Sequence, residues 1–498
     1  MGIIQKDSIK STIISYFGLF LGYLNKGVLF VYILTTEQIG LINLILSLSV
    51  LFAQFSNFGV LNSIIKFNHF FTKKIVVKRY FLKYLFKIIF FGVIVATSLF
   101  IVFDGFVTGY YSKNSKLFVD YYYWVIPLGI ANITFISLEA YLRANFNNII
   151  SVFLNDILLR GMVSFSLLIL LFKWINFEQF FILHTVIYFI PVLILLIYTF
   201  NKYPLRSNKI TSTAKSEFNR YKKIILKYSL YNHSNTIGTL FVFTLDGMMI
   251  TYFLNLEATG VYTTMLYLTS ALLVPYKALM RITYPFIPLY WKEKNSTKMN
   301  QLYKDTGNVS FIVTGLLSAL FFVNIDHFFN LLPANFLIGK NVFLILMIGK
   351  IVDVYLGLNG WILVTSKNYA KDIYFTVTLL IIAFFMNLFL IPKYGLLGAA
   401  IATSIAIILY NIFRSIYIYK IYSLSPFDKS HFKSFFLMGI LFSLNYWEIG
   451  NFFISLFVKS ILIISVFLIF ILKFNLSEDL KRIVQSKINN MSFKKLKS

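Results

Sequence analysis

Several residue types on which soluble enzymes rely are scarce or absent in this chain. It has no cysteine among 498 residues, which excludes disulfides, thiolate nucleophiles and cysteine-ligated metals. Only 13% of its residues are charged, about half the usual share of a soluble domain, and 19 acids stand against 46 Lys and Arg. Its five histidines are scattered without ligand spacing. We therefore predict no metal centre and no bound cofactor.

The short motifs of nucleotide and metal enzymes are missing as well. The sequence contains no Walker G-x-x-x-x-G-K-[ST], no G-x-G-x-x-G and no H-E-x-x-H. The longest loops expected outside the cytoplasm, around 104–116 and 324–339, have only about a dozen residues each, too few to fold a catalytic domain. The sequence thus predicts a protein that is not an enzyme and that works within a membrane.

Apolar sequence is abundant, because 58% of the residues are hydrophobic. It is divided into fourteen segments of roughly the 20 residues that cross a bilayer as a helix. These are 9–34, 38–65, 80–103, 118–142, 148–171, 177–200, 228–254, 258–290, 304–325, 340–365, 371–391, 395–421, 433–447 and 451–473. The pattern predicts an all-α polytopic membrane protein with about 14 transmembrane helices.

Basic residues are concentrated in alternate loops. About 33 Lys and Arg lie at the termini and in every second loop, against 5 in the loops between. The longest basic interval, 201–227, holds eight cations and the single acid Glu217. By the positive-inside rule these loops and both termini are cytoplasmic. The net charge of +27 is then explained by topology and attraction to anionic membrane lipids, and no nucleic-acid partner is predicted.

The two halves of the chain resemble each other. Without any gap, six residues of the first half recur 220 positions later, and they share an E-x-x-G element: Gly18, Gly27, Tyr32, Leu34, Glu37 and Gly40 reappear as Gly238, Gly247, Tyr252, Leu254, Glu257 and Gly260. We interpret this as an internal repeat, as in a transporter built from two similar bundles.

Several charges inside the predicted spans form pairs within one helix. Glu139 with Arg143 and Asp156 with Arg160 are separated by four residues, and Lys350 with Asp353 by three. Each pair can neutralise itself on one helix face, so a purely structural role is one reading. Arg143, Arg281 and Arg414 lie near cytoplasmic helix ends, where we expect them to snorkel toward water.

Lys26 and Asp246 differ from these pairs. Each lies in mid-span without an opposite charge within a turn, and each precedes a glycine of the repeat, Gly27 and Gly247. Buried charges are costly and often functional, so we predict that the two face each other as a gate or a substrate and proton site. Packing against another helix is the alternative for each.

Cations outnumber acids inside the spans, which favours a cavity for an anionic ligand such as a pyrophosphate. The candidate substrate-binding or gating residues are Lys26, Asp246, Arg160, Lys277 and Lys350, and the candidate ion-coupling residues are Asp246, Asp156, Asp353 and Glu139. Pro275, Pro285 and Pro288 predict a bent or broken eighth span, a device that transporters use.

The chain resembles the Wzx-type polysaccharide flippases of the multidrug, oligosaccharidyl-lipid and polysaccharide exporter superfamily. Four stretches carry the resemblance: Lys10-Ser11 leading into a span with Gly18 and Gly22, the Leu34–Gly40 turn with its counterpart Glu257–Gly260, the segment at Gly59, and the small-residue run Gly395–Thr403. With the layout of fourteen spans, it covers essentially the whole chain.

The resemblance implies a V-shaped pair of pseudo-symmetric six-helix lobes plus two C-terminal helices. The N-lobe would be 1–200, the inter-lobe loop 201–227, the C-lobe 228–422, the added helices 423–474 and the basic tail 475–498. Family members move a polyprenyl-pyrophosphate-linked oligosaccharide across the bacterial inner membrane by an ion gradient. Proton and sodium are the alternative coupling ions, and other polysaccharide-assembly membrane proteins are the expected partners.

Other functions share parts of this pattern. A drug or cation antiporter of the same superfamily would have the same fold, with twelve spans and a more acidic interior. A flippase for the peptidoglycan precursor would look alike, since its cargo is also a polyprenyl-linked sugar. A membrane glycosyltransferase or polymerase should have a large extracytoplasmic loop, which is absent here. Asp246 departs from the cationic cavity that the resemblance implies and leaves the charge of that cavity open.

Overall fold

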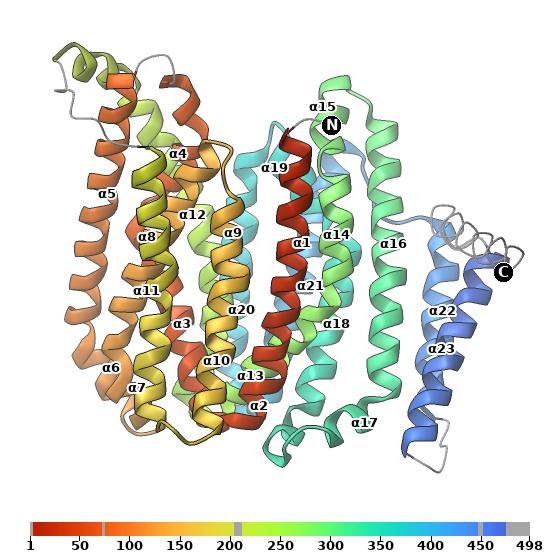
Figure 1. Ribbon diagram of the computed structural model, residues 1–498. Helices are drawn as coiled ribbons and strands as arrows, with labels where there is room; N and C mark the ends of the chain where they lie inside the picture. The colour runs from red at the N-terminus through yellow and green to blue at the C-terminus, as the bar shows by residue number, and fades with distance from the viewer. Residues whose placement is uncertain (1–2, 72–74, 204–211, 447–451, 475–498) are drawn as a thin grey trace, which may run out of the picture. The chain divides into compact units, whose positions relative to one another are not determined.

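The secondary structure is helical throughout the described part of the chain. The computed structural model describes residues 3–71, 75–203, 212–446 and 452–474 (Figure 1). Ten helices in these ranges are long and apolar enough to cross a membrane, and one bent pair raises the number to eleven. The predicted all-α polytopic membrane fold is confirmed.

Each of the fourteen predicted apolar segments coincides with one helix or with a run of consecutive helices. The eighth is broken where its prolines predict: Pro275 opens one helix and Pro285 precedes the next. The thirteenth forms a helix of only 12 residues. Part of the basic interval, with Arg206 and Lys209, lies outside the described residues, as do Trp447 and the tail 475–498.

The chain forms two compact units, Met1–Thr264 and Met265–Ser498. The first holds the helices of the first seven predicted spans. They are α1 (Ile3–Tyr23), η1 (Leu24–Leu29), α2 (Phe30–Ile33), α3 (Thr36–Asn57), α4 (Val60–Phe67), α5 (Ile75–Val102), α6 (Asp104–Tyr111), α7 (Lys116–Tyr121), α8 (Val125–Ala144), α9 (Ile149–Phe153), η4 (Leu154–Leu158), α10 (Leu159–Leu171), α11 (Phe177–Lys202) and α12 (Ser212–Phe253). The predicted lobes follow the repeat rather than these units, and their boundaries stay a prediction.

Helix α13 (Leu256–Thr269) runs from the first unit into the second. The second unit continues with η5 (Ser270–Leu273), α14 (Val274–Thr283), α15 (Phe286–Glu293), α16 (Ser296–Val323), α17 (Ile325–Asn330), α18 (Lys340–Leu356), α19 (Leu358–Thr365), α20 (Asp372–Tyr394), α21 (Leu396–Tyr422), α22 (Phe432–Ser443) and α23 (Phe452–Phe474). Short 3₁₀ turns connect several of these helices.

Helices α3 and α13 start in the same way, at positions 220 residues apart. The side chains of Thr35 and Asn255 each accept a hydrogen bond from the amide three residues further on, at 3.2 and 2.8 Å. Such caps satisfy amides that the first turn leaves without a partner. Glu37 and Glu257 follow in the first turn, where a carboxylate interacts favourably with the helix dipole. The repeated E-x-x-G element therefore marks two equivalent helix starts.

The glycines that end this element bring the two helices into backbone contact. A Cβ atom on Gly40 would collide with the carbonyl oxygen of Leu256, and one on Gly260 with that of Thr36. Each added Cβ would also lie 3.0 Å from the backbone nitrogen of the other glycine. Because Thr36 and Leu256 are themselves 220 positions apart, the contact is reciprocal, as across a local two-fold axis.

The seventh span, α12, is held at both of its ends by other residues of the first unit. At its C-terminal end, Tyr111, Asn114 and Ser115 donate hydrogen bonds of 3.1, 3.0 and 3.3 Å to carbonyls in the last six residues of α12. The carbonyls of Thr251 and Tyr252 are among the last four of the helix, which have no helical partner. Burial, aided by the neighbouring Tyr252, raises the pKa of Tyr111 to about 12, so its phenol stays protonated and remains a donor.

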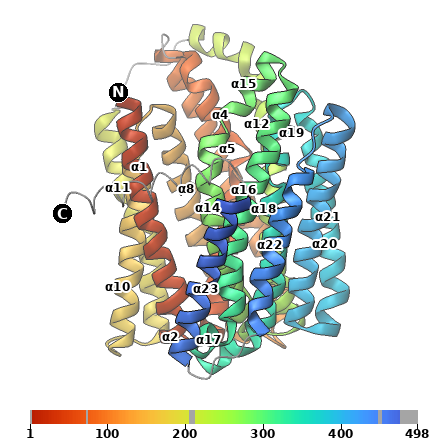
Figure 2. The ribbon, with the colours of Figure 1, turned by 90° about the vertical axis from the view of Figure 1, so that its right-hand side faces the viewer.

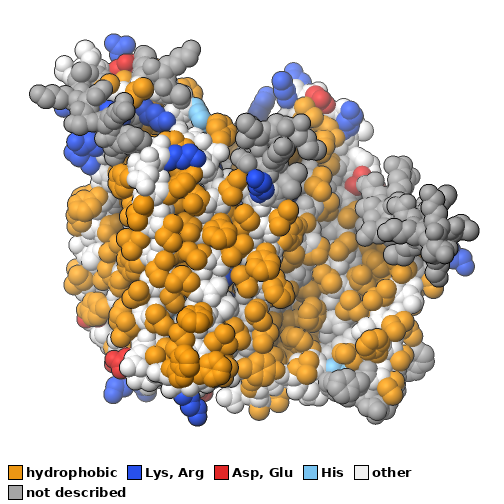
Figure 3. Space-filling model, in the orientation of Figure 1, with side chains coloured by type: hydrophobic (Ala, Val, Ile, Leu, Met, Phe, Trp, Pro, Cys, Tyr) orange, Lys and Arg blue, Asp and Glu red, His pale blue; other side chains and the backbone are white. Residues whose placement is uncertain are grey.

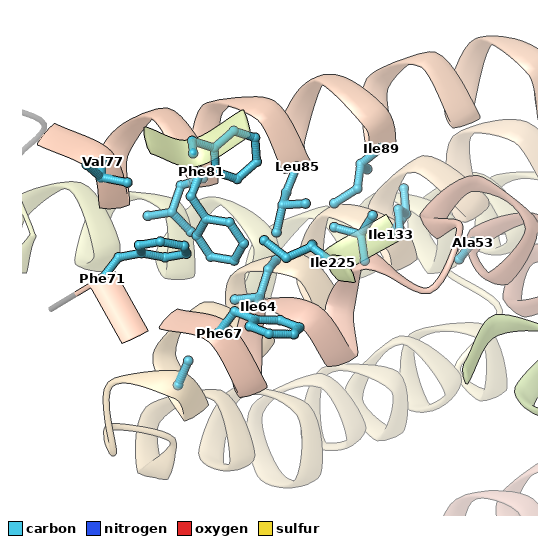
Figure 4. Packing of buried hydrophobic residues seen from close by; sticks show 14 residues of the cluster. Ala53, Ile64, Phe67, Phe71, Val77, Phe81, Leu85, Ile89, Ile133 and Ile225 are labelled. Atoms are coloured by element: carbon cyan, nitrogen blue, oxygen red, sulfur yellow. The ribbon is translucent and has the colours of Figure 1, made fainter. Parts of the chain in front are cut away.

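At the other end, α12 packs through an apolar core shown in Figure 4. Phe218 and Ile225 are fully buried there among residues of α4, α5 and α8. Phe218 lies against the rings of Phe71 and Phe81, with centroids 6.4 and 6.2 Å away. This core fixes α12 beside α4 and α5.

The two C-terminal helices pack on the second unit. Helices α22 and α23 lie beside each other and against α16 (Figure 2). Their contact is a continuous apolar cluster that includes Ile312, Leu437 and Ile463. On the face of the molecule seen in Figure 3, hydrophobic side chains cover the middle of the helices, and Lys and Arg lie toward the helix ends. This distribution is expected of helices surrounded by lipid.

We expect the change Gly260→Ala to destabilise the first unit, because its methyl group would force α3 and α13 apart. Overpacking of this kind costs about 1–3 kcal/mol. The matched control is Gly161→Ala, since a Cβ at Gly161 meets nothing within 4 Å. Thermal unfolding of the purified variants in detergent measures the effect. Equal melting temperatures for Gly260→Ala and wild type would contradict the close contact.

Candidate functional site

Two short π-helical turns interrupt helices of the first unit, and both carry a predicted site residue. Lys26 lies in η1, and Asp156 lies in η4. π-Helical turns are rare and are frequent at functional sites. Helix α1 packs directly on η4, because a Cβ atom on Gly18 would be only 2.5 Å from the Cβ of Asp156. The absence of a side chain at Gly18 therefore lets an acidic residue approach the backbone of the first span.

The predicted pairing of Asp156 with Arg160 is present, at 3.7 Å. Asp156 also accepts a hydrogen bond of 3.0 Å from Ser15, and Arg160 donates one to the carbonyl of Gly18. The backbone carbonyl of Arg160 in turn accepts a hydrogen bond of 2.8 Å from the side-chain amide of Asn25. The first and fifth spans are thus joined by a polar network that includes both charges.

Lys26 connects this region to the contact between α3 and α13. Its ammonium group donates to Oδ1 of Asn43 at 2.9 Å, and Nδ2 of Asn43 donates to Oγ1 of Thr263 at 3.1 Å. Asn43 and Thr263 are again equivalent positions of the repeat, and each lies one turn beyond its glycine, Gly40 or Gly260. Lys26 therefore donates directly to a side chain that lies one turn from the contact of Gly40 with Gly260.

Asp246 reaches the same contact from the second copy of the repeat. Only 3% of its surface is exposed, and Oδ2 accepts a hydrogen bond of 2.8 Å from the hydroxyl of Tyr262. Tyr262 precedes Thr263 in α13. The equivalent residues Lys26 and Asp246 thus each bind a side chain of the helix pair α3 and α13. Their direct pairing stays a prediction.

The remaining predicted residues lie in different surroundings. Glu139 and Arg143 form an ion pair near the end of α8, and the Arg143 side chain is half exposed. Lys277 is exposed on α14, in the second unit. Lys350 is buried in α18, with 6% of its surface exposed, and Asp353 accepts a hydrogen bond of 2.9 Å from Asn411. Of these two residues of α18, Lys350 thus lies in the interior of the second unit, and Asp353 is partly buried beside α21.

The sequence analysis missed a buried ion pair in the second unit. Arg414 does not snorkel: its guanidinium group lies 2.5 Å from Asp372, and both side chains are 7% exposed. Asn359 accepts a second hydrogen bond from Arg414, at 3.3 Å, and donates to Asn411 at 3.1 Å. One sequence signal was available, since Asn411, Arg414 and Ser415 lie on one face of α21.

Within the described ranges, no group of three His, Asp or Glu side chains is arranged to hold a metal ion. The polar networks instead combine amides, hydroxyl groups and single charges. Such groups can orient a charged ligand or a proton.

Comparison with known proteins found similarity in structure only. No family model and no curated protein matches the sequence. A lipid II flippase MurJ structure in an inward closed conformation is 13% identical, with a TM-score of 0.70, and the alignment covers 95% of this chain and 99% of that one. An inward-facing multidrug resistance MATE family transporter of the MOP superfamily gives 14% identity and a TM-score of 0.58, over 81% and 94% of the two chains.

The chain has the fold of these transporters. An outward-facing MATE structure agrees, with 13% identity and a TM-score of 0.51 over 85% of this chain and 96% of that one. The fold that the sequence resemblance implied is therefore confirmed, because these structures share it. At these identities the similarity concerns architecture, and the choice among substrates depends on the site.

The buried pair of Arg414 and Asp372 gives a test of the second unit. We expect Arg414→Met to lower the free energy of unfolding by about 3–5 kcal/mol, because it leaves a buried carboxylate without its cation. The double change Arg414→Met with Asp372→Leu should recover most of this loss, since no charge then stays buried. Thermal unfolding in detergent measures both variants. A double variant less stable than Arg414→Met would contradict a role confined to charge pairing.

Proposed function

We propose that the protein is a flippase for a polyprenyl-pyrophosphate-linked oligosaccharide, such as an O-antigen, capsule or exopolysaccharide repeat unit. It carries this lipid from the cytoplasmic to the periplasmic leaflet of the bacterial inner membrane by ion-coupled alternating access. The observation that supports this most is the match to a lipid II flippase, which extends over 95% of the chain. The structures of multidrug resistance MATE transporters align with less of it.

The charges of the first unit suit such a cargo. Lys26 and Arg160 are cations in the middle of apolar helices. Lys26 donates to Asn43, and Arg160 donates to the Gly18 carbonyl and is also paired with Asp156. A pyrophosphate offers several oxygens to such donors. In this proposal the headgroup is attracted by four cations: Lys26, Arg160, Lys277 and Lys350. The proposal also places both chain termini in the cytoplasm.

Acidic residues provide the coupling in the same scheme. Asp246 is buried and bound to a tyrosine hydroxyl, so proton or cation binding there would change the charge next to Thr263 and the two-fold contact. Asp156, Asp353 and Glu139 are the other coupling candidates. Binding and release of the coupling ion at Asp246 would therefore act directly on the contact between α3 and α13.

A second candidate is the flippase of the peptidoglycan precursor, favoured by the structural similarity to MurJ, which is named as a flippase of lipid II. Its cargo would meet the same cations, because it too is a sugar on a polyprenyl pyrophosphate. An antiporter of drugs or cations shares the fold and is the third candidate. The cargo itself distinguishes the three.

Deletion of the gene is the first test. We expect a complete oligosaccharide repeat unit on polyprenyl pyrophosphate to accumulate while the surface polysaccharide disappears, as measured by mass spectrometry of the lipid fraction. A plasmid copy should reverse both effects. Accumulation of the peptidoglycan precursor would favour the second candidate. Unchanged lipids and polysaccharide with altered sensitivity to cationic drugs would favour the antiporter.

Complementation of the deletion strain tests the two mid-span charges. Lys26→Gln and Asp246→Asn should each lower polysaccharide export about tenfold or more, since hydrogen bonds to charged groups contribute about 1.5–3 kcal/mol. The control is Lys113→Gln, an exposed lysine between α6 and α7.

The charge swap Lys26→Asp with Asp246→Lys tests their direct pairing. If the two charges face each other, the double variant should recover export that both single reversals abolish. A double variant that recovers no export would count against pairing, while loss of export in Lys113→Gln would show that the assay responds to any change of charge. Immunoblots of membranes confirm equal protein amounts.

A further inference from the structure

A cavity of about 540 Å³ lies within the first unit, among α5, α8 and α11. This volume is in the range of about 300–1,000 Å³ that is typical of ligand pockets. Its walls are mostly apolar and include Leu82, Phe86 and Leu196. None of its lining residues belongs to the polar networks of Lys26 or Asp246. The cavity is thus a separate feature from the candidate transport site.

The charged residues of the cavity lie toward one end of α5. Arg79 and Lys83 line it within the first nine residues of that helix, whereas Ile89 lines it ten residues beyond Arg79. At 1.5 Å per residue, the cavity therefore extends about 15 Å along α5 from a cationic end to an apolar one. The positive-inside rule assigns the cationic end to the cytoplasmic face, at the level of lipid headgroups.

Two polar atoms at this cavity lack a hydrogen-bond partner among the described residues. They are Nη1 of Arg79 and Oγ1 of Thr199. Thr199 is only 9% exposed. A buried polar group without a partner costs about 1–3 kcal/mol, more for a charged one. An anionic oxygen between them would satisfy both donors at once.

We propose that this cavity binds an anionic phospholipid. Its phosphate lies against Arg79 and Lys83 and accepts a hydrogen bond from Thr199, and one acyl chain follows the apolar wall past Phe86 toward Ile89. A free phosphate would leave the apolar length of the cavity unused, and a zwitterionic lipid would add a cation beside two others. The bound lipid would join α5 to α8 and α11, whatever cargo the protein carries.

Native mass spectrometry of the full-length protein tests the proposal. The protein is extracted in mild detergent and mixed with dioleoyl phosphatidylglycerol, with dioleoyl phosphatidylcholine, or with inorganic phosphate. We expect one phosphatidylglycerol to bind at low concentration, with weaker binding of phosphatidylcholine and none of phosphate. Equal affinities for the two lipids, or binding of phosphate alone, would overturn the proposal.

Charge-removing variants locate the site. Each basic residue near an anionic headgroup contributes about fivefold to affinity, so Arg79→Gln with Lys83→Gln should weaken phosphatidylglycerol binding about 30-fold. The matched control is Lys87→Gln, which removes a charge from the same helix outside the cavity lining. An equal loss in the control, or no loss in the double variant, would contradict the assignment.

A second variant tests the apolar part and keeps both cations. Thr134 lines the cavity from α8, and Thr134→Phe should fill part of its volume and displace the acyl chain. We expect it to weaken lipid binding at least as much as the double charge variant does, with unchanged elution in size-exclusion chromatography. Unchanged lipid affinity in this folded variant would place the lipid elsewhere.

Discussion

The reciprocal contact of Gly40 and Gly260 is the constraint on which the first unit depends. Two helix backbones touch there because neither glycine has a side chain, and each fits against the carbonyl at the start of the other helix. Equivalent positions of the two repeats therefore face each other. One turn further on, the same register places Asn43 against Thr263 and so aligns the polar groups that bind Lys26.

Charges in apolar helices are tolerated here because specific polar partners lie beside them. Asp156 contacts Arg160, Asp246 contacts Tyr262, and Arg414 contacts Asp372. The partners differ in kind. Asp156 and Arg414 each contact a side chain of opposite charge, whereas Asn43 accepts a hydrogen bond from Lys26 and Tyr262 donates one to Asp246.

Much of the fold could be predicted because helix position and helix breaks depend on local sequence. The fourteen apolar segments, the broken eighth span at Pro275 and Pro285, and the equivalent starts of α3 and α13 all follow from hydropathy, backbone chemistry and capping. Less of the candidate site could be predicted from the sequence. Lys26 and Asp246 were identified as unusual by depth and repeat position, but their partners Asn43 and Tyr262 gave no signal of their own.

The sequence by itself determined the all-α membrane architecture, the uneven distribution of basic residues and the 220-residue repeat, since these are properties of composition and spacing. Only the tertiary structure decided which side chains meet. Arg414 looked free to reach water, yet helix packing turns it toward Asp372. The reason is that contacts between distant segments depend on the rotation and close packing of helices, which hydropathy along one helix does not specify.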